Sequence, residues 1–529
     1  MTIEASLAMQ RKIVEALHDP RRYPHPVSNF TLIETHISFV LLTGEFAYKI
    51  KKAVDLGFVD YTTLAQRRFC CEEELRLNRR LASQLYLEVV ALGGSPDNPH
   101  LAAEDWAIEY AVKMRQFEQT DLLDQVLARN SLLAGHIDKL AAMLGAFHRN
   151  APACAADQSY GSAALIRSQL EALLPPFEPP TDARDRDYGA LEVWCRKEYA
   201  RLYEVFALRK SCGFVREGHG DLHLGNMVLL DREVLIFDCI EFNPALRWVD
   251  IASDIAFLSM DLAAHGRSDF AWRLLNAWLE TTGDYAALEL LRFYQAYRAL
   301  VRTKVASLRL ADPALSSDAR HAAKASHAAY MNYACTLTNP GARAVIITHG
   351  LSGSGKSTLA RSIAASLGAL CLRSDVERKR LRRLPSMAHD GSNVGTGLYA
   401  ESVTQATYDR LLALASTVLA ADYPVVVDAT FLRRPQRERF AELARTVGVP
   451  FMILDCHAPR GVLQQRIAAR AERGGDASDA DLAVLDWQIS HAETLGQDEQ
   501  AATVTIDTLM KDHGGSTAAV REHLRPNLP

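Results

Sequence analysis

Two glycine-containing strings in this sequence belong to different folds. His219–Asn226 reads HGDLHLGN, and the apolar run that follows it ends at Asp238. Gly350–Ser357 reads GLSGSGKS and stands shortly after the apolar run Ala344–Thr348. The first string has the layout of a catalytic loop, and the second is a complete P-loop. The sequence therefore predicts two domains joined end to end.

The length of the chain agrees with this division. A chain of 529 residues is too long for one core and corresponds to about three to four units of ~150 residues. We expect a two-lobed domain over residues 1–338 and a second domain over residues 342–529. The boundary lies at Thr338–Gly341, where Asn, Pro and Gly interrupt a helical pattern before the next apolar strand.

The composition excludes several classes of partner. With 48% hydrophobic residues, 23% charged residues and a formal net charge of −5, we expect no general binding to nucleic acid or to an anionic membrane. The nine cysteines show no metal-ligand spacing, which favours reduced thiols and a cytoplasmic location. Neither a signal peptide nor a run of 18 apolar residues is found, so we expect no membrane span. The oligomeric state is not indicated.

The N-terminal part has the pattern of a sheet with one inserted helix. The expected elements are a helix over residues 5–18, strands over 37–42 and 46–50, a helix over 64–83, and strands over 87–92 and 106–113. The chain then crosses at residues 114–117 into a mainly helical region. This is the order of a kinase small lobe, about residues 25–117, before a large lobe, about residues 118–338.

From residue 344 onward, strands and helices alternate. Apolar strands are expected over residues 344–348, 369–372, 425–427 and 451–454, with helices between them. Such alternation is typical of a parallel sheet with helices on both faces. The fold class is therefore α/β and α+β multidomain, with an N-terminal bilobal kinase-like fold and a C-terminal P-loop NTPase sheet.

The first string provides the residues that phosphoryl transfer requires. At the spacing His-x-Asp-x4-Asn, Asp221 is the candidate catalytic base and Asn226 a candidate Mg²⁺ ligand. Asp238 ends the second strand of a hairpin, Met227–Leu230 with Val234–Phe237, which would bring it beside Asn226. Oxygen ligands suit Mg²⁺. Taken alone, Asp221 could be a turn residue and Asp238 a strand-end cap.

This region, roughly residues 30–310, resembles the aminoglycoside/choline phosphotransferase family, whose mark is the His-Gly-Asp-x-His-x-x-Asn loop. The resemblance implies a kinase-like bilobal fold with ATP and Mg²⁺ as cofactors. It also implies a lysine on a small-lobe strand that pairs with a helix glutamate. Thr35–Ser38 stands where protein kinases have a glycine-rich loop, and this favours a small-molecule acceptor.

Two lysines and three glutamates could form that ATP-binding pair. Lys49 fits the strand lysine best, and Lys51 is its rival because both lie on one strand face. Glu74 is favoured over Glu72 and Glu73, because Leu77 and Leu81 follow it at helical spacing. All three could instead belong to a solvated helix face.

The acceptor of the first site is not named by any motif. In the expected helix Phe293–Ala306, Arg298 lies near Tyr294, Tyr297 and Arg302. Arg298 is our candidate substrate ligand, although such a stripe is also typical of core and surface residues.

The second string predicts an ATP site at the start of a helix. Backbone N–H groups there cradle phosphates, Lys356 reaches the β/γ pair as a catalytic residue, and Ser357 binds Mg²⁺. The candidate ATP-binding residues are Gly350, Ser352, Gly353, Ser354, Gly355, Lys356, Ser357 and Thr358.

Two later strand ends carry carboxylates, and ligands gather at the carboxyl ends of parallel strands. Asp375 is a candidate catalytic base, and Arg378, one helical turn on, a candidate clamp for an anionic acceptor. Asp428 is a candidate Mg²⁺ ligand. Helix capping for Asp375 and a turn for Asp428 are the alternatives. Arg470, in a helix that also carries Arg466 and Arg473, is a candidate ATP ligand in a lid, or part of a basic surface.

The second half resembles the small P-loop kinases, among them gluconate kinases, polynucleotide kinase domains and zeta-toxin-like enzymes, through Ser-Asp-x-x-Arg and Val-Asp-Ala-Thr. Both resemblances together imply a bifunctional ATP-dependent kinase whose partners are small hydroxylated metabolites of sugar or amino-sugar type. The alternatives are one active half with a regulatory ATP-binding half, or a toxin-like or ATP-sensing switch that acts on a protein, RNA or nucleotide sugar.

Overall fold

The computed structural model describes residues 3–101, 106–174, 183–339, 341–384, 400–473, 478, 480–509 and 513–524, without the side chains of 183–187, 473 and 513–516. The chain divides into two units. Unit 1 comprises Met1–His136, Ala151–Glu171 and Leu202–Leu258. Unit 2 comprises Ile137–Asn150, Ala172–Arg201 and Ser259–Pro529. The predicted boundary at residues 338–342 stays a prediction.

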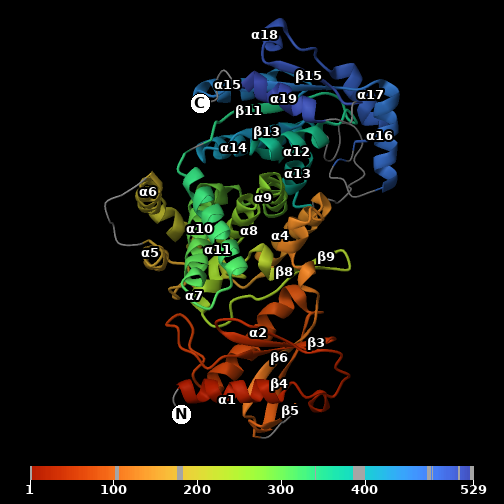
Figure 1. Cartoon of the computed structure of the whole chain (residues 1–529). Helices are drawn as coiled ribbons and strands as arrows, with labels where there is room; N and C mark the ends of the chain where they lie inside the picture. Colours follow the sequence, from red (N-terminus) through yellow and green to blue (C-terminus); the bar gives the residue numbers. More distant parts are fainter. Residues whose placement is uncertain are drawn as a thin grey trace. The chain divides into compact units, whose positions relative to one another are not determined.

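Unit 1 contains a six-stranded antiparallel sheet in the order β1-β2-β3-β6-β4-β5 (Figure 1). Its strands are β1 Thr31–Glu34, β2 Ser38–Leu42, β3 Phe46–Lys51, β4 Tyr86–Ser95, β5 Asn98–Leu101 and β6 Glu109–Arg115. The sequence pattern predicted β2, β3, β4 and β6. It missed β1 and β5, which lie at the two edges of the sheet and are largely exposed. Such strands lack the apolar alternation that marks a half-buried strand.

Two helices cover opposite faces of this sheet. Ile13 and Val14 of α1 (Ile3–Ala16) pack with Phe39 and Tyr48. Cys71 of α2 (Leu64–Ala82) packs on the other face with Ala47 and Val112, because neighbouring strand residues point to opposite faces. Helix α2 begins with a capping box in which Thr63 and Gln66 bond each other's backbone N–H groups.

The region around the candidate catalytic loop of unit 1 is built from short elements. Strand β7 (Val215–Glu217) pairs with β10 (Trp248–Asp250), and β8 (Met227–Leu230) pairs with β9 (Glu233–Ile236). The predicted hairpin is present, but Glu233 belongs to β9. The turn is Asp231-Arg232, and both residues have positive φ, 49° and 67°, as a two-residue type I′ turn requires.

Helices account for most of the remaining chain before residue 340. The α-helices are α3 Leu123–Ala128, α4 Ala134–Asn150, α5 Ala163–Glu171, α6 Ala183–Ser211, α7 Pro244–Arg247, α8 Ile251–Ala264, α9 Ser268–Thr282, α10 Leu288–Leu310 and α11 Ser317–Thr336. The 3-10 helices are η1 Pro20–Arg22, η2 Gln119–Asp121, η3 Leu224–Asn226 and η4 Tyr285–Ala287.

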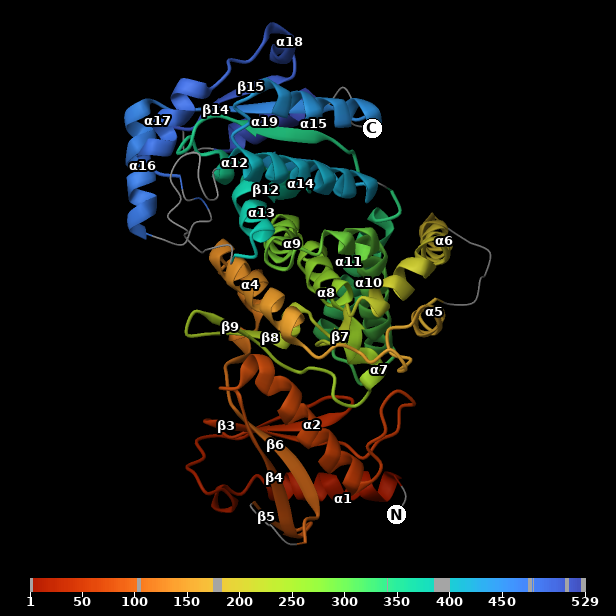
Figure 2. The same cartoon turned by 180° about the vertical axis from the view of Figure 1, so that it is seen from behind.

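Unit 2 contains a five-stranded parallel sheet in the order β12-β13-β11-β14-β15 (Figure 2). Its strands are β11 Val345–His349, β12 Leu370–Arg373, β13 Val425–Asp428, β14 Phe451–His457 and β15 Thr503–Asp507. The helices after residue 350 are α12 Lys356–Leu367, α13 Ser374–Leu381, α14 Glu401–Ala420, α15 Arg434–Val447, α16 Arg460–Arg473, α17 Leu482–His491, α18 Gln497–Gln500 and α19 His513–Leu524. The sequence pattern missed β15, an edge strand in which Val504 and Ile506 alternate with polar residues and pack on the core.

The parallel sheet is covered on both faces, as predicted. Ile346 and Met452 face the side where α12 and α19 complete one buried core. Helices α14 and α15 pack on the opposite face of the same strands. The predicted fold class is therefore confirmed in both parts. In the described part of the chain, no helix combines the length and apolar character that a membrane span needs.

Gln10 offers a test of whether α1 is an integral part of the first sheet's core. Its amide is fully buried and bonds Lys51 O at 2.8 Å, Glu109 Oε2 at 2.7 Å and Ala53 N at 2.8 Å. We expect Gln10→Ala to lower the free energy of unfolding by roughly 1–3 kcal/mol, because buried partners lose their hydrogen bonds. In urea unfolding, Lys12→Ala on the exposed side of α1 should change it by less than about 0.5 kcal/mol. Equal stability of both variants would contradict this role.

Candidate active sites

A partly buried lysine in unit 1 connects the sheet, the helix and the hairpin. Lys49 Nζ on β3 lies 2.8 Å from Glu74 Oε1 on α2 and 2.5 Å from Asp238 Oδ1, just beyond β9. Asp238 has a φ of 62°, a conformation that costs energy in a non-glycine residue and is often found at functional sites. The structure thus brings together three residues that the sequence named for ATP and Mg²⁺.

The rival lysine makes different contacts. Lys51 Nζ lies 2.6 Å from Glu74 Oε2 and also binds Glu241, and its side chain is only 1% exposed. Lys49 is 13% exposed. Only Lys49 is in contact with Asp238, which makes it the better candidate for a ligand, whereas Lys51 is enclosed among protein groups.

The contacts of the three candidate glutamates on α2 also distinguish them from one another. Glu74 is fully buried between the two lysines. Glu72 forms an exposed ion pair with Arg68, and Glu73 pairs with Arg76. Of these three glutamates, Glu74 is therefore the one that pairs with both candidate lysines.

The charges of this cluster support one another. Burial raises the pKa of Glu74, but Lys49 and Lys51 outweigh it and lower that pKa to about 2. Burial lowers the pKa of Lys49, but Asp238 and Glu74 outweigh it and hold that pKa well above its usual value. Glu74 and Lys49 are therefore both charged near neutral pH.

The catalytic loop is held by a carboxylate that the sequence reading missed. Asp254, fully buried in α8, accepts hydrogen bonds from His219 N at 2.7 Å and Gly220 N at 3.0 Å. Gly220 has a φ of 85°, and a Cβ there would lie 2.5 Å from Leu246 O. Glycine is needed because the loop passes this close to another backbone segment.

Asp221, Asn226 and Asp238 lie in one neighbourhood. Asn226 Nδ2 donates to Asp221 O and to Asp221 Oδ2, both at 3.0 Å. Phe237 N donates to Asn226 O at 2.9 Å, so Asp238 follows directly beside it, as the hairpin predicted. His223 Nε2 lies 3.3 Å from Asp221 Oδ2. The carboxylate and amide oxygens fit Mg²⁺ by their chemistry.

In unit 2, the P-loop follows β11 and requires its glycines. Gly353 has a φ of 81°, and a Cβ there would lie 2.8 Å from Leu463 O. At Gly350, with a φ of 133°, a Cβ would lie 2.5 Å from Cys456 O. Gln488 accepts a hydrogen bond from Ser352 N at 2.8 Å. The loop is therefore fixed from outside as well as by its own turns.

Lys356 and the candidate Mg²⁺ ligand Asp428 are close enough that the charge of each affects the pKa of the other. Lys356 Nζ donates to Leu351 O at 2.7 Å. Burial lowers the pKa of Lys356, and Asp428 opposes that shift. Ser357 lowers the pKa of Asp428 and thus opposes the effect of burial on that carboxyl group. A hydroxyl and a carboxylate at the start of α12 and the end of β13 provide the oxygen donors that Mg²⁺ prefers.

The predicted acceptor residues are in contact with each other. Arg378 Nη1 donates to Asp375 Oδ1 at 2.9 Å, and Asp375 is 24% exposed. Asp375 also raises the pKa of Lys356 through its charge. The structure thus places Asp375 near the P-loop lysine, and its role as a base stays a prediction.

The arginine-rich helix α16 contacts the P-loop through a residue that was not selected from the sequence. Arg466 Nη1 donates to Gly353 O at 3.2 Å and to Thr508 Oγ1 at 3.0 Å. Arg470 donates to Ala480 O at 2.6 Å and acts on Lys356 only through its charge. The side chain of Arg473 lies outside the described residues. Thr358 is exposed on α12.

Comparison with known proteins shows a family. The chain is 31% identical over 491 residues to "Uncharacterized protein Rv2004c" of Mycobacterium tuberculosis, which covers 90% of this chain and 95% of the relative. The same identity and coverage hold for "Uncharacterized protein Mb2027c" of Mycobacterium bovis. This chain belongs to the Rv2004c family. Residues 345–495 also match the family described as AAA domain, which confirms the predicted P-loop domain in this family member.

The chain is also similar to solved structures of kinases, at lower sequence identity than to these relatives. "Amicoumacin kinase hAmiN in complex with AMP-PNP, Ca2+ and Ami" is 12% identical with a TM-score of 0.39, over 62% of this chain and 95% of that one. A gluconokinase from Sinorhizobium meliloti 1021 is 25% identical with a TM-score of 0.22, over 35% of this chain and 90% of that one. TM-scores this low do not bear on function.

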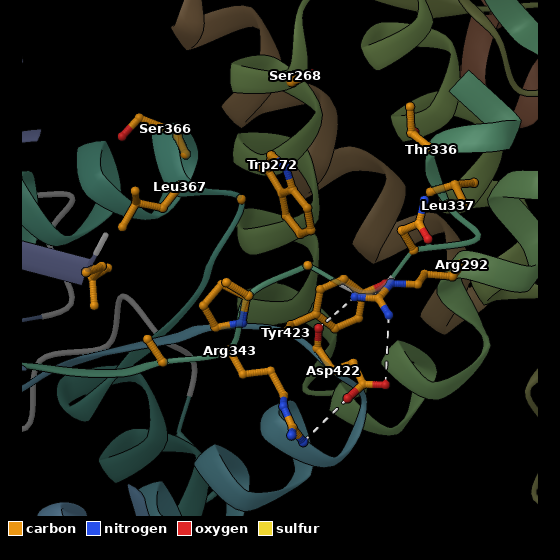
Figure 3. Close-up of a pocket in the computed structure, with 18 of the residues that line it drawn as sticks. Ser268, Trp272, Arg292, Thr336, Leu337, Arg343, Ser366, Leu367, Asp422 and Tyr423 are labelled. Carbon is orange, nitrogen blue, oxygen red and sulfur yellow. Dashed lines mark hydrogen bonds and ion pairs between the residues drawn. The ribbon is translucent and has the colours of Figure 1, made fainter. Parts of the chain in front are cut away.

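Two features of unit 2 of this family member stand apart from the P-loop site. Arg298 is 5% exposed in α10, with its guanidinium 5.5 Å from the ring centre of Tyr297, and its role in acceptor binding stays a prediction. A cavity of about 570 Å³ (Figure 3) is lined by residues that include Ala344, Pro424 and Pro450. These precede β11, β13 and β14, so the cavity adjoins the strand ends opposite the P-loop. None of the predicted site residues is among the described residues that line it.

The two lysines of β3 should respond differently to the same substitution. We expect Lys49→Met to weaken ATP binding in unit 1 by about tenfold to a hundredfold, since hydrogen bonds to charged groups contribute about 1.5–3 kcal/mol. Lys51→Met should instead lower the free energy of unfolding by about 3–5 kcal/mol, because it leaves Glu241 buried without its cation. Nucleotide titration and urea unfolding check the two effects. Equal loss of affinity in both variants would show that the assignment of Lys49 is wrong.

The P-loop site should lose Mg²⁺ as the pH is lowered. Burial raises the pKa of Asp428, and the nearby Arg373, Ser357 and Lys356 only partly oppose this. As the pH falls, Asp428 therefore takes up its proton earlier than an ordinary carboxyl group. We expect the Mg²⁺-dependent nucleotide affinity of this site to fall as the pH is lowered, and this fall should begin at a higher pH than for an ordinary carboxyl group. Asp428→Asn should remove this pH dependence. A pH series of calorimetric titrations tests this, and an unchanged acid limb in the variant would contradict it.

Proposed function

We propose that this protein is a bifunctional ATP-dependent kinase that transfers the γ-phosphate of ATP to hydroxyl groups of small metabolites at two sites. The observation that carries the proposal is the contact of Lys49 with both Glu74 and Asp238. This arrangement joins a cation for phosphates to a carboxylate suited to Mg²⁺. The Lys356, Ser357 and Asp428 group supports a second, independent site.

In the first site, Asp221 would accept the proton of the acceptor hydroxyl while it orients that hydroxyl toward the γ-phosphate. His223 and the Asn226 amide hold the Asp221 carboxylate from two sides. Lys49 would bind the phosphates, and Glu74 keeps the lysine in place. Asn226 and Asp238 would hold Mg²⁺, which neutralises phosphate charge when bound.

In the second site, the P-loop amides would bind the phosphates and Lys356 would stabilise the charge that develops on the transferred group. Ser357 and Asp428 would hold Mg²⁺. Asp375 would take the proton of the acceptor hydroxyl, and Arg378, which now binds Asp375, would turn to an anionic acceptor. Asp375 and Arg378 come from the carboxyl end of β12, where ligands of parallel sheets bind.

The location of the protein is also part of the proposal. All nine cysteines are free thiols, and most are buried. Free thiols are typical of a reducing compartment. Together with the small-molecule acceptors that we propose, this supports a cytoplasmic metabolic enzyme.

Single substitutions separate the two activities. In the full-length chain, we expect Asp221→Asn to reduce transfer at the first site by about 10² or more, the scale of a general base, while nucleotide affinity is kept. Lys356→Ala should abolish transfer at the second site. The measurement is label transfer from γ-labelled ATP to a panel of sugars, amino sugars and aminoglycosides.

The outcomes of this experiment distinguish the alternatives. Loss of different labelled products in the two variants supports two active sites. If only one variant loses a product, the other half is regulatory. Nucleotide binding without any labelled acceptor would contradict the kinase proposal and favour an ATP-dependent switch.

A further inference from the structure

Helix α9 lies against one edge of the parallel sheet in unit 2 (Figure 2). Strand β12 is the edge strand of this sheet, so its outer backbone groups need partners other than a strand. Asn276 of α9 supplies them. Its Nδ2 donates to Ala369 O at 3.0 Å, and its Oδ1 accepts from Cys371 N at 2.7 Å. A single side chain thus replaces part of a missing neighbouring strand.

The C-terminal turn of α9 contacts the end of the same strand through charge. Glu280 Oε1 lies 2.7 Å from Arg373 Nη1, at the last residue of β12. Arg380 Nη2 donates to Glu280 O at 2.5 Å. Glu280 is therefore held by both its side chain and its carbonyl at the carboxyl edge of the sheet, where the P-loop site lies.

Arg373 also faces the candidate Mg²⁺ ligand. Its Nε lies 3.6 Å from Asp428 Oδ2 on the neighbouring strand β13. The side chains of Arg373 and Asp428 are only 6% and 5% exposed. Two carboxylates, Glu280 on one side and Asp428 on the other, thus share one buried guanidinium.

We propose that Glu280 and Arg373 are positioning residues for Asp428, through which helix α9 sets the Mg²⁺ affinity of the P-loop site. The inference rests on the proposed function of that site. The Glu280 carboxylate pairs with Arg373 and offsets part of its positive charge, so that Asp428 stays able to bind a cation. Without this carboxylate, Arg373 would pair more strongly with Asp428 and would compete with Mg²⁺.

A second contact between α9 and β12 involves no charged side chain, and it therefore serves as a comparison for the Glu280 contact. Asn276 ties α9 to β12 through neutral hydrogen bonds. Asn276 is the matched control, because it lies on the same helix and binds the same strand as Glu280.

The test measures ADP affinity by calorimetry with Mg²⁺ and with EDTA, so that it does not depend on turnover. The full-length chain carries Lys49→Met to weaken binding at the first site, so that the titration reports mainly on the P-loop site. We expect Glu280→Gln to reduce the gain in affinity that Mg²⁺ provides by about fivefold or more, the lower end of typical coupling between sites. Asn276→Ala should lower thermal stability and leave that gain unchanged. In a chain with Asp428→Asn, Glu280→Gln should have no further effect, because the coupled residue is gone.

The possible results separate this inference from the proposed function. Three results would each overturn the inference. The gain in ADP affinity from Mg²⁺ could be unchanged in Glu280→Gln, or Asn276→Ala could reduce that gain as much as Glu280→Gln does. In the third case, Glu280→Gln would reduce the gain further in the chain that carries Asp428→Asn. Lys356→Ala serves as the control for the site itself. If that variant still binds MgADP like the parent chain, the proposed P-loop function is wrong, whatever Glu280 does.

Discussion

The burial of charge at the Glu74 carboxylate determines how unit 1 is arranged. A carboxylate in a protein interior must be paired, because an isolated buried charge is very costly. Two ammonium groups, from Lys49 and Lys51, meet this need. Each lysine has a second carboxylate, Asp238 or Glu241, on the segment that follows the hairpin. The sheet, helix α2 and the post-hairpin segment are therefore held together by one charge network, which also forms the candidate phosphate site.

In unit 2, the candidate phosphate site is formed by backbone groups in addition to charged side chains. The P-loop presents N–H groups at the start of α12, and its glycines allow the chain to pass close to Cys456 and Leu463. Lys356 and Asp428 are buried beside this loop. The network extends to Arg373 and from there to Glu280 on α9. A helix whose sequence lies well before the P-loop therefore belongs to the electrostatic surroundings of the P-loop site.

The sequence predicted the elements whose residues carry a local pattern. Strands with a buried face, such as β3 and β11, and helices with an apolar stripe, such as α2, were placed within a few residues. Edge strands β1 and β5 were missed because they lack apolar alternation. Strand β15 was missed although Val504 and Ile506 alternate with polar residues in it. Asp254 and Arg466 were also missed as site residues. Their partners, the backbone of the catalytic loop and of the P-loop, lie far from them in sequence, and no spacing rule connects such pairs.

The sequence by itself determined the two loops, their residues Asp221, Asn226, Lys356 and Ser357, and the order of folds along the chain, because these depend on short-range spacing and on glycine conformation. Only the tertiary structure distinguishes the contacts of Lys49 from those of Lys51, since both lie on one strand face and differ in which carboxylate of a distant segment each one reaches. It also decided that Glu280 shares Arg373 with Asp428. Burial and long-range charge are properties of the packed chain, and no local pattern of residues records them.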